Sequence, residues 1–222
     1  MFDQLNVPRT AIATDNPVLF DDGRAAMEFY TPSNKYFGRQ IIPVGNRWSD
    51  GTRSFMAPVA HYHLLQTETF HVESGRGLWY LKGKTIERSA GQDITIPKYT
   101  WHTFENHPDS AEPLVILYRY DSQRFIMEES FFRNTLTYLW DCGRAGVEPS
   151  VLQLSVFIVA AWMPADFVQC PGDYLSCFVN TLAMWMFAFI GRFVYGYKST
   201  YPEYWDEEYI RTRIGEESKK AA

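Results

Sequence analysis

Three histidines and one glutamate in the middle of the chain are residue types that bind transition metals. His61 and His63 are two residues apart, so both imidazoles point to the same face if the segment is extended. Four residues separate His63 from Glu68, and His102 lies in a second polar cluster further along. Three imidazoles and one carboxylate form a mixed nitrogen and oxygen ligand set, which suits a divalent first-row metal.

The cysteines, the N-terminal residues and the net charge exclude several other kinds of site and of protein. The cysteines lie elsewhere, at Cys142, Cys170 and Cys177, which argues against a zinc ribbon or an iron–sulfur cluster. Their odd number fits a reducing compartment, and the N-terminal residues show no signal-peptide pattern, so we expect a cytoplasmic protein. The formal net charge is −5 with no basic block, which argues against nucleic acid as a partner.

Two motifs around these four residues resemble those of the cupin superfamily. The first motif is Gly, five residues, His-x-His, three or four residues, Glu, six residues, Gly; the second is Gly, five residues, Pro-x-Gly, two residues, His, three residues, Asn. Phe55 stands where the first motif has its leading Gly, and Tyr99 replaces the middle Gly of the second. The matched positions are His61, His63, Glu68, Gly75, Gly91, Pro97, His102 and Asn106.

The resemblance covers roughly Arg39–Asp121 and implies a small jelly-roll β-barrel with a metal inside its open mouth. It assigns the ligand roles to His61, His63, Glu68 and His102. One divalent transition metal is expected, iron first, with Mn, Ni, Cu, Co and Zn as alternatives. Glu68 has two alternative roles: it stays a ligand, or it swings away as a catalytic general base with a pKa raised by burial.

The fold class we expect is mainly β: a single cupin jelly-roll β-barrel, as the resemblance implies, with a C-terminal helical extension, as the hydrophobic pattern predicts. Residues 1–38 are predicted to form an N-terminal arm of irregular strands. Residues 39–125 alternate short apolar runs with turn formers, which is typical of a sandwich or barrel. Residues 126–222 change to a helical pattern. The first residues that recur at helical spacing are Phe132, Leu136 and Leu139.

Two uncharged stretches in the extension have more than one interpretation. Val151–Ala165 is short for a membrane span, and Tyr174–Gly191, eighteen residues long, is borderline. The favoured interpretation is that these helices cap one side of the barrel or form a dimer contact, so a homodimer stays open. The alternative is an apolar surface that makes peripheral membrane contact and collects an apolar substrate, which would make the protein membrane-associated.

Strand alternation indicates which aromatic side chains share a face with the ligands. Phe70 lies two residues after Glu68, and Phe104 lies two residues after His102. An aromatic mouth with few polar groups suits a hydrophobic small-molecule substrate, whereas simple barrel core is the alternative for most of these rings. The candidate substrate-pocket residues are Phe70, Trp79, Tyr99, Phe104 and Tyr118.

Four functions compete for this site. The favoured one is an oxygen-dependent, dioxygenase-like oxidoreductase of secondary metabolism, the last point by analogy with similar cupins. The second is a non-redox metal cupin that catalyses isomerisation, cyclisation or decarboxylation. The third is a non-catalytic cupin that binds a small molecule. A sugar-nucleotide epimerase is disfavoured because the sequence shows no basic phosphate cradle.

Overall fold

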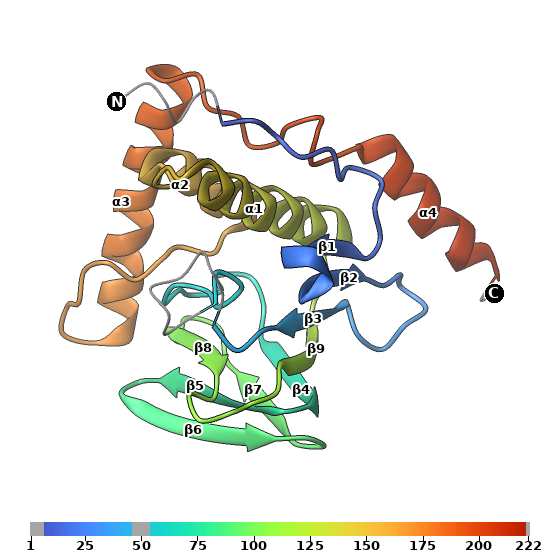
Figure 1. The fold of residues 1–222 in the computed structure, drawn as a ribbon. Helices are drawn as coiled ribbons and strands as arrows, with labels where there is room; N and C mark the ends of the chain where they lie inside the picture. Colours follow the sequence, from blue (N-terminus) through green and yellow to red (C-terminus); the bar gives the residue numbers. More distant parts are fainter. Residues whose placement is uncertain (1–6, 46–53, 221–222) are drawn as a thin grey trace.

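The computed structural model describes residues 7–45 and 54–220, which form two antiparallel sheets with helices packed over one side (Figure 1). In spatial order, the larger sheet consists of β1 (Val18–Phe20), β2 (Ala25–Phe29), β3 (Gly38–Ile42), β9 (Leu114–Tyr120), β4 (Glu68–Ser74) and β7 (Asp93–Ile96). The smaller sheet consists of β6 (Lys84–Ser89), β5 (Arg76–Leu81) and β8 (His102–Asn106).

The two sheets face each other across a shared aromatic core. The ring of Phe70 on β4 lies 5.0 Å from that of Phe104 on β8 and 5.9 Å from that of Trp79 on β5, between centroids. Alternate side chains of β4 are buried, so Glu68 and Val72 face the same interior as Phe70. The period-two pattern of the strands therefore places a carboxylate inside an otherwise apolar core.

Turns with left-handed backbone fix the register of these strands. Lys82 and Gly83, with φ of 48° and 74°, form the two-residue loop between β5 and β6, where both central residues need positive φ. Gly75, between β4 and β5, has φ of 77°, and a Cβ there would lie 2.4 Å from the Pro113 carbonyl oxygen. The backbone therefore requires glycine at this motif position.

The predicted N-terminal arm contributes to the larger sheet. Strands β1 and β2 pair with each other around the short 3₁₀ turn η2 (Asp21–Gly23), and β2 pairs with β3. The described part of residues 1–38 therefore contributes strands to the larger sheet. The boundaries at residues 38 and 125 stay predictions.

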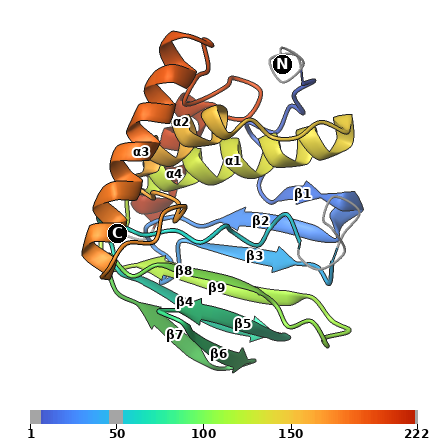
Figure 2. The ribbon, with the colours of Figure 1, turned by 90° about the vertical axis from the view of Figure 1, so that its left-hand side faces the viewer.

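In the part of the chain that the structure describes, four helices follow the strands: α1 (Phe125–Ala145), α2 (Val151–Ala161), α3 (Asp173–Phe193) and α4 (Glu207–Lys220). Helices α1 and α2 lie across the sheets above β2 and β3 (Figure 2). The Ser150 side chain accepts a hydrogen bond from the Gln153 backbone N–H at the start of α2. Helix α2 ends at Ala161, four residues before the end of the predicted stretch at Ala165, because Trp162 adopts a left-handed conformation with φ of 58°.

A buried ion pair fastens α1 to the N-terminal segment. The Arg133 guanidinium donates to the Glu129 carboxylate at 2.9 Å, and both side chains are fully buried. Arg133 also donates to the backbone carbonyls of Ile12 and Asp15 at 2.9 and 2.8 Å. These bonds satisfy a charge inside the protein and hold α1 in place over the sheets.

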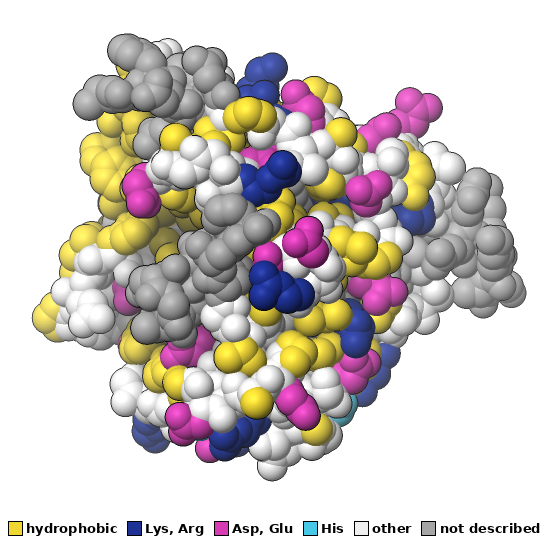
Figure 3. All heavy atoms as spheres, viewed as in Figure 1, with side chains coloured by type: hydrophobic (Ala, Val, Ile, Leu, Met, Phe, Trp, Pro, Cys, Tyr) yellow, Lys and Arg dark blue, Asp and Glu magenta, His cyan; other side chains and the backbone are white. Residues whose placement is uncertain are grey.

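Helix α3 packs on α2 with one side and leaves the other side uncovered. The packing is close: a Cβ on Gly191 would lie 2.8 Å from the Leu152 carbonyl oxygen. By length and composition α3 could cross a membrane, and only 28% of its apolar window is buried. Hydrophobic side chains gather where α3 lies, at the left of Figure 3. The exposed ones, which we call the outer face of α3, are Tyr174, Leu175, Phe178, Leu182, Trp185, Met186, Phe189 and Phe193.

Candidate metal centre

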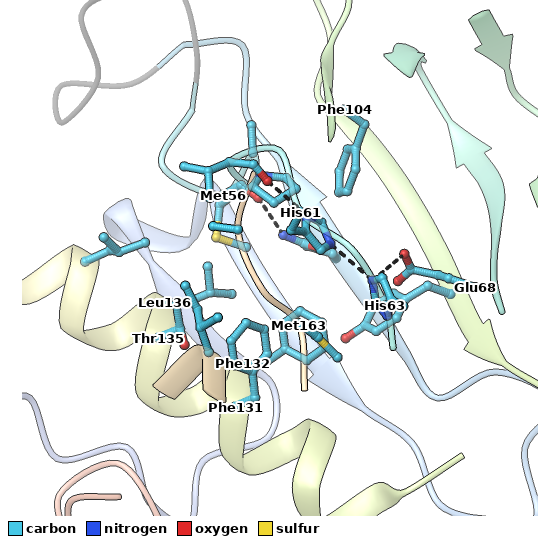
Figure 4. A pocket seen from close by; sticks show the side chains of 18 of the residues that line it. Met56, His61, His63, Glu68, Phe104, Phe131, Phe132, Thr135, Leu136 and Met163 are labelled. Atoms are coloured by element: carbon cyan, nitrogen blue, oxygen red, sulfur yellow. Dashed lines mark hydrogen bonds and ion pairs between the residues drawn. The ribbon is translucent and has the colours of Figure 1, made fainter. Parts of the chain in front are cut away.

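The four predicted ligands come from three separate segments of the chain and meet at one point. His61 and His102 exchange both backbone hydrogen bonds, each 3.0 Å long, which brings the His-x-His segment against the start of β8. Glu68 is the first residue of β4. One ligand atom from each of His61, His63, Glu68 and His102 lies within 4.8 Å of all the others. Figure 4 shows His61, His63 and Glu68 directed toward one another.

The contacts among the ligand atoms are short. The Nε2 atoms of His61 and His63 are 3.1 Å apart. The Glu68 Oε2 atom lies 3.3 Å from His63 Nε2 and 3.2 Å from His102 Nε2. His63, Glu68 and His102 are buried, whereas His61 is partly accessible. Side chains so close and so buried form a preorganised donor cluster.

Backbone carbonyls orient two of the three imidazoles. His61 Nδ1 lies 2.9 Å from the Val59 carbonyl oxygen, and His102 Nδ1 lies 3.1 Å from the Thr100 carbonyl oxygen. A carbonyl oxygen only accepts, so each Nδ1 carries a proton and donates it. Each Nε2 is then the ring nitrogen directed at the cluster, and it offers a lone pair to a metal when it carries no proton. This arrangement is typical of metal-binding histidines, and the donor set fits a divalent transition metal.

The electrostatics favour the protonation states that a metal site needs. Burial, together with the neighbouring His102 and His63, lowers the pKa of His61 well below its usual value. Burial disfavours the charged form of Glu68, but His63 and His102 outweigh it and hold the pKa of that carboxyl well below its ordinary range. The expectation of a raised pKa at Glu68 is therefore wrong. An ionised carboxylate among imidazoles is a ready ligand.

A cavity of about 160 Å³ extends from this cluster, with His61, His63 and Glu68 at one end (Figure 4). Strands of the two sheets provide one wall, which includes Phe70, Phe104, Tyr118 and Tyr120. No Lys or Arg occurs among the lining residues that the structure describes. The opposite wall comes from α1, α2 and the segment after α2, and it contains Phe131, Phe132, Thr135, Leu136, Leu139, Leu154, Ile158 and Met163.

Three of the five predicted pocket residues line this cavity: Phe70, Phe104 and Tyr118. Trp79 is outside the described lining, because it lies in the core between the sheets, stacked on Phe104 at 5.7 Å between centroids. Tyr99 is also outside it. Its φ of 60° keeps the left-handed turn of the motif glycine, and its ring lies on the surface, 5.8 Å from that of Tyr174 on α3.

The sequence did not identify the helical wall as part of the site. The helical spacing of Phe132, Leu136 and Leu139 predicted a helix, but a periodic pattern does not say what the apolar face of a helix covers. Tyr120 could have been found, since it shares a strand face with Tyr118.

Residues 54–119 match the family model described as a cupin domain. This part of the chain is a cupin domain. The matched range includes all four residues of the donor cluster and strands β4 to β8 in full. The predicted cupin fold, antiparallel sheets followed by C-terminal helices, is confirmed.

Three fungal proteins are similar to this cupin in sequence. The probable oxidoreductase virH of Hypocrea virens is 29% identical over 204 residues, which is 90% of each chain. The oxidoreductase iacF of Pestalotiopsis fici is 31% identical and covers 60% of this chain and 63% of that protein. The epoxidase atD of Aspergillus terreus is 31% identical over 67% of this chain, which spans about half of that relative's length, 48%. The chain contains a cupin domain, is similar to proteins named as oxidoreductases, and has a group of side chains that could hold a metal.

Proposed function

We propose that this cupin is an oxygen-dependent metalloenzyme that oxidises a hydrophobic small organic molecule, as a dioxygenase or a related oxidative cupin does. The observation that carries the proposal is the position of three imidazoles and one carboxylate at the end of an apolar cavity. The names of the related fungal proteins agree with oxidation as the reaction class.

His61, His63, Glu68 and His102 would hold one divalent metal, with iron as the first choice. When bound, such a metal supplies redox chemistry toward dioxygen and Lewis acidity toward substrate oxygens. The donor set itself carries one negative charge, on Glu68. A divalent ion would therefore leave the site with net positive charge, which favours a phenolate or enolate oxygen on the substrate.

The remaining residues would bind and orient the substrate. Phe70, Phe104 and the helical wall exclude water and accept an apolar skeleton. The hydroxyl of Tyr118 is buried and makes no hydrogen bond with described residues, whereas that of Tyr120, whose ring lies 5.6 Å from that of His63, interacts with the Glu68 carboxylate. An unsatisfied donor in an apolar cavity favours a ligand with an oxygen function, because binding would satisfy it.

The test compares product formation with different metals, in the presence and in the absence of dioxygen. Chelator-treated protein is reloaded anaerobically with Fe²⁺, Mn²⁺ or Zn²⁺ and mixed with a panel of hydrophobic phenols and polyketide-like compounds. We expect product to form only with a redox-active metal and dioxygen, with uptake of ¹⁸O from ¹⁸O₂ measured by mass spectrometry. His102→Ala should abolish the reaction, and His71→Ala should not, because His71 is paired with Asp93 outside the cluster.

Two other results would reject this function. Equal product formation with Zn²⁺ under argon would show a non-redox metal cupin. Tight binding of a panel compound without turnover under any condition would indicate a cupin that only binds a small molecule.

A further inference from the structure

The segment that follows α2 pairs with the His-x-His segment. His61 forms an antiparallel bridge with Ala165 in addition to its bridge with His102. The His-x-His segment is therefore held between the start of β8 on one side and the C-terminal extension on the other. The backbone hydrogen bonds to the extension run from Tyr62 N–H to Pro164 O (2.9 Å), from Leu64 N–H to Trp162 O (3.2 Å) and from Asp166 N–H to Ala60 O (2.7 Å).

Tyr62, which separates the two histidine ligands, also connects the His-x-His segment to the C-terminal extension through its side chain. Because side chains alternate along an extended segment, its ring points away from the imidazoles. The ring is fully buried, and its hydroxyl donates to Asp166 Oδ1 at 2.9 Å. The same carboxylate oxygen accepts a hydrogen bond of 3.0 Å from the Asn180 side-chain amide on α3.

Asn180 in turn fixes the position of Asp166. Its side chain is fully buried, and its Oδ1 accepts from the backbone N–H groups of Phe167 and Val168 at 2.8 and 2.9 Å. Its Nδ2 also donates to the backbone carbonyl of Ser176 at 2.9 Å. A buried side chain that satisfies several backbone groups of the loop holds that loop, and with it Asp166, rigidly on α3.

We propose that Tyr62, Asp166 and Asn180 are positioning residues of the metal centre, through which α3 holds the His-x-His segment at the spacing that the metal requires. The inference rests on the proposed metal site and extends it to Asp166 and Asn180, which lie far outside the cupin motifs. Its physical basis is that partners outside the ligand set orient the ligands and tune metal affinity. The C-terminal extension would then be needed for metal binding as well as for the cavity.

The first test uses two substitutions that each remove one buried tyrosine hydroxyl. Tyr62→Phe breaks the bond to Asp166, and Tyr204→Phe breaks a bond of the same kind, 2.7 Å long, to Asp141 in α1. Both rings are fully buried. Co²⁺ is titrated into metal-free protein, and its visible absorption reports affinity and ligand geometry. We expect Tyr62→Phe to weaken Co²⁺ binding about tenfold or more and change the spectrum, with Tyr204→Phe like the wild type.

The second test asks whether the hydrogen-bond acceptor or the charge matters. Asp166→Asn keeps an oxygen that can accept from Tyr62 and Asn180, so it should bind Co²⁺ like the wild type, whereas Asp166→Ala should bind as weakly as Tyr62→Phe. Wild-type affinity and spectrum in both Tyr62→Phe and Asp166→Ala would overturn the positioning role, as would equal losses in Tyr204→Phe. A wild-type protein that binds no Co²⁺ would instead refute the metal site itself.

Discussion

The two walls of the cavity differ in chemistry and in origin. On the cupin side, strands and the His-x-His segment present imidazoles and a carboxylate whose protonation states are set by close contacts and backbone carbonyls. On the opposite side, α1 and α2 present aromatic and aliphatic side chains, with Thr135 as a polar exception. The first wall holds reactive groups, and the second shapes the space beside them.

Because of this difference, we expect the first wall to determine the reactivity of the site and the second wall to determine which ligands fit. A metal site tolerates little change, because four donors must converge. An apolar wall can exchange one side chain for another of different size at modest cost. Substitutions in the first wall should therefore change metal binding, and substitutions in the second should change stability and ligand fit.

The largest expected effect is stabilisation by metal, which acts through the first wall. A metal that binds only the folded chain adds about 4 kcal/mol to the free energy of unfolding when its free concentration is about a thousand times its dissociation constant. Urea unfolding with and without Co²⁺ measures this gain. His63→Ala should lose it and His71→Ala should keep it; equal gains in both variants would place the ion elsewhere.

A buried carboxyl in the first turn of α1 should make stability depend on pH. Burial raises the pKa of Glu128 from 4.5 to about 7. As pH rises through this window, the unfolded chain releases a proton that the folded chain still holds, so the free energy of unfolding falls, by about 3 kcal/mol in total. Urea unfolding at pH 5 and pH 8 measures the fall.

Glu128→Gln provides the control for that effect. The amide oxygen can still accept from the Arg124 backbone N–H, as the carboxylate does at 2.8 Å. The variant should flatten the pH dependence and gain stability relative to the wild type at pH 8. An unchanged slope would assign the pH dependence to other groups.

Leu136→Ala probes the helical wall. Leu136 is buried and borders the cavity, so its truncation should cost about 2 kcal/mol, the low end for such a change, because one side of the leucine already faces open space. Co²⁺ affinity should stay within about twofold of the wild type. A large loss of metal affinity would contradict the separation of the two walls.

The smallest effect is expected on the outer face of α3. Phe178→Ser and Phe189→Ser should each change the free energy of unfolding by about 0.5 kcal/mol or less, because both rings are exposed. A cost equal to that of Leu136→Ala would show that another copy of the chain covers this face in solution. Loss of co-sedimentation with phosphatidylcholine vesicles in the double variant would support the membrane contact that the sequence left as an alternative.

The sequence predicted the first wall better than the second for a physical reason. His61, His63 and Glu68 lie within one short stretch, where strand alternation and motif spacing determine which side chains share a face. His102 was found through the second motif. The strands and most turns followed from local apolar runs and from glycines such as Gly75.

The helical wall depends on contacts between distant residues that leave no local pattern. The junction of Tyr62 with Asp166 joins residues 104 apart in the chain. Periodicity marked the helices near Leu136 but not the cavity that they cover. Tyr99 shows a further limit, because its type suggested a pocket role, whereas its backbone conformation directs it to α3.

The most direct test of the account is a crystal structure of metal-loaded protein with anomalous scattering recorded at the absorption edge of the bound ion. The account predicts one anomalous peak per chain, bonded to the Nε2 atoms of His61, His63 and His102 and to the Glu68 carboxylate, and facing the apolar cavity. A peak at any other place, or a fully loaded protein in which one of these three imidazoles turns away from the ion, would contradict it.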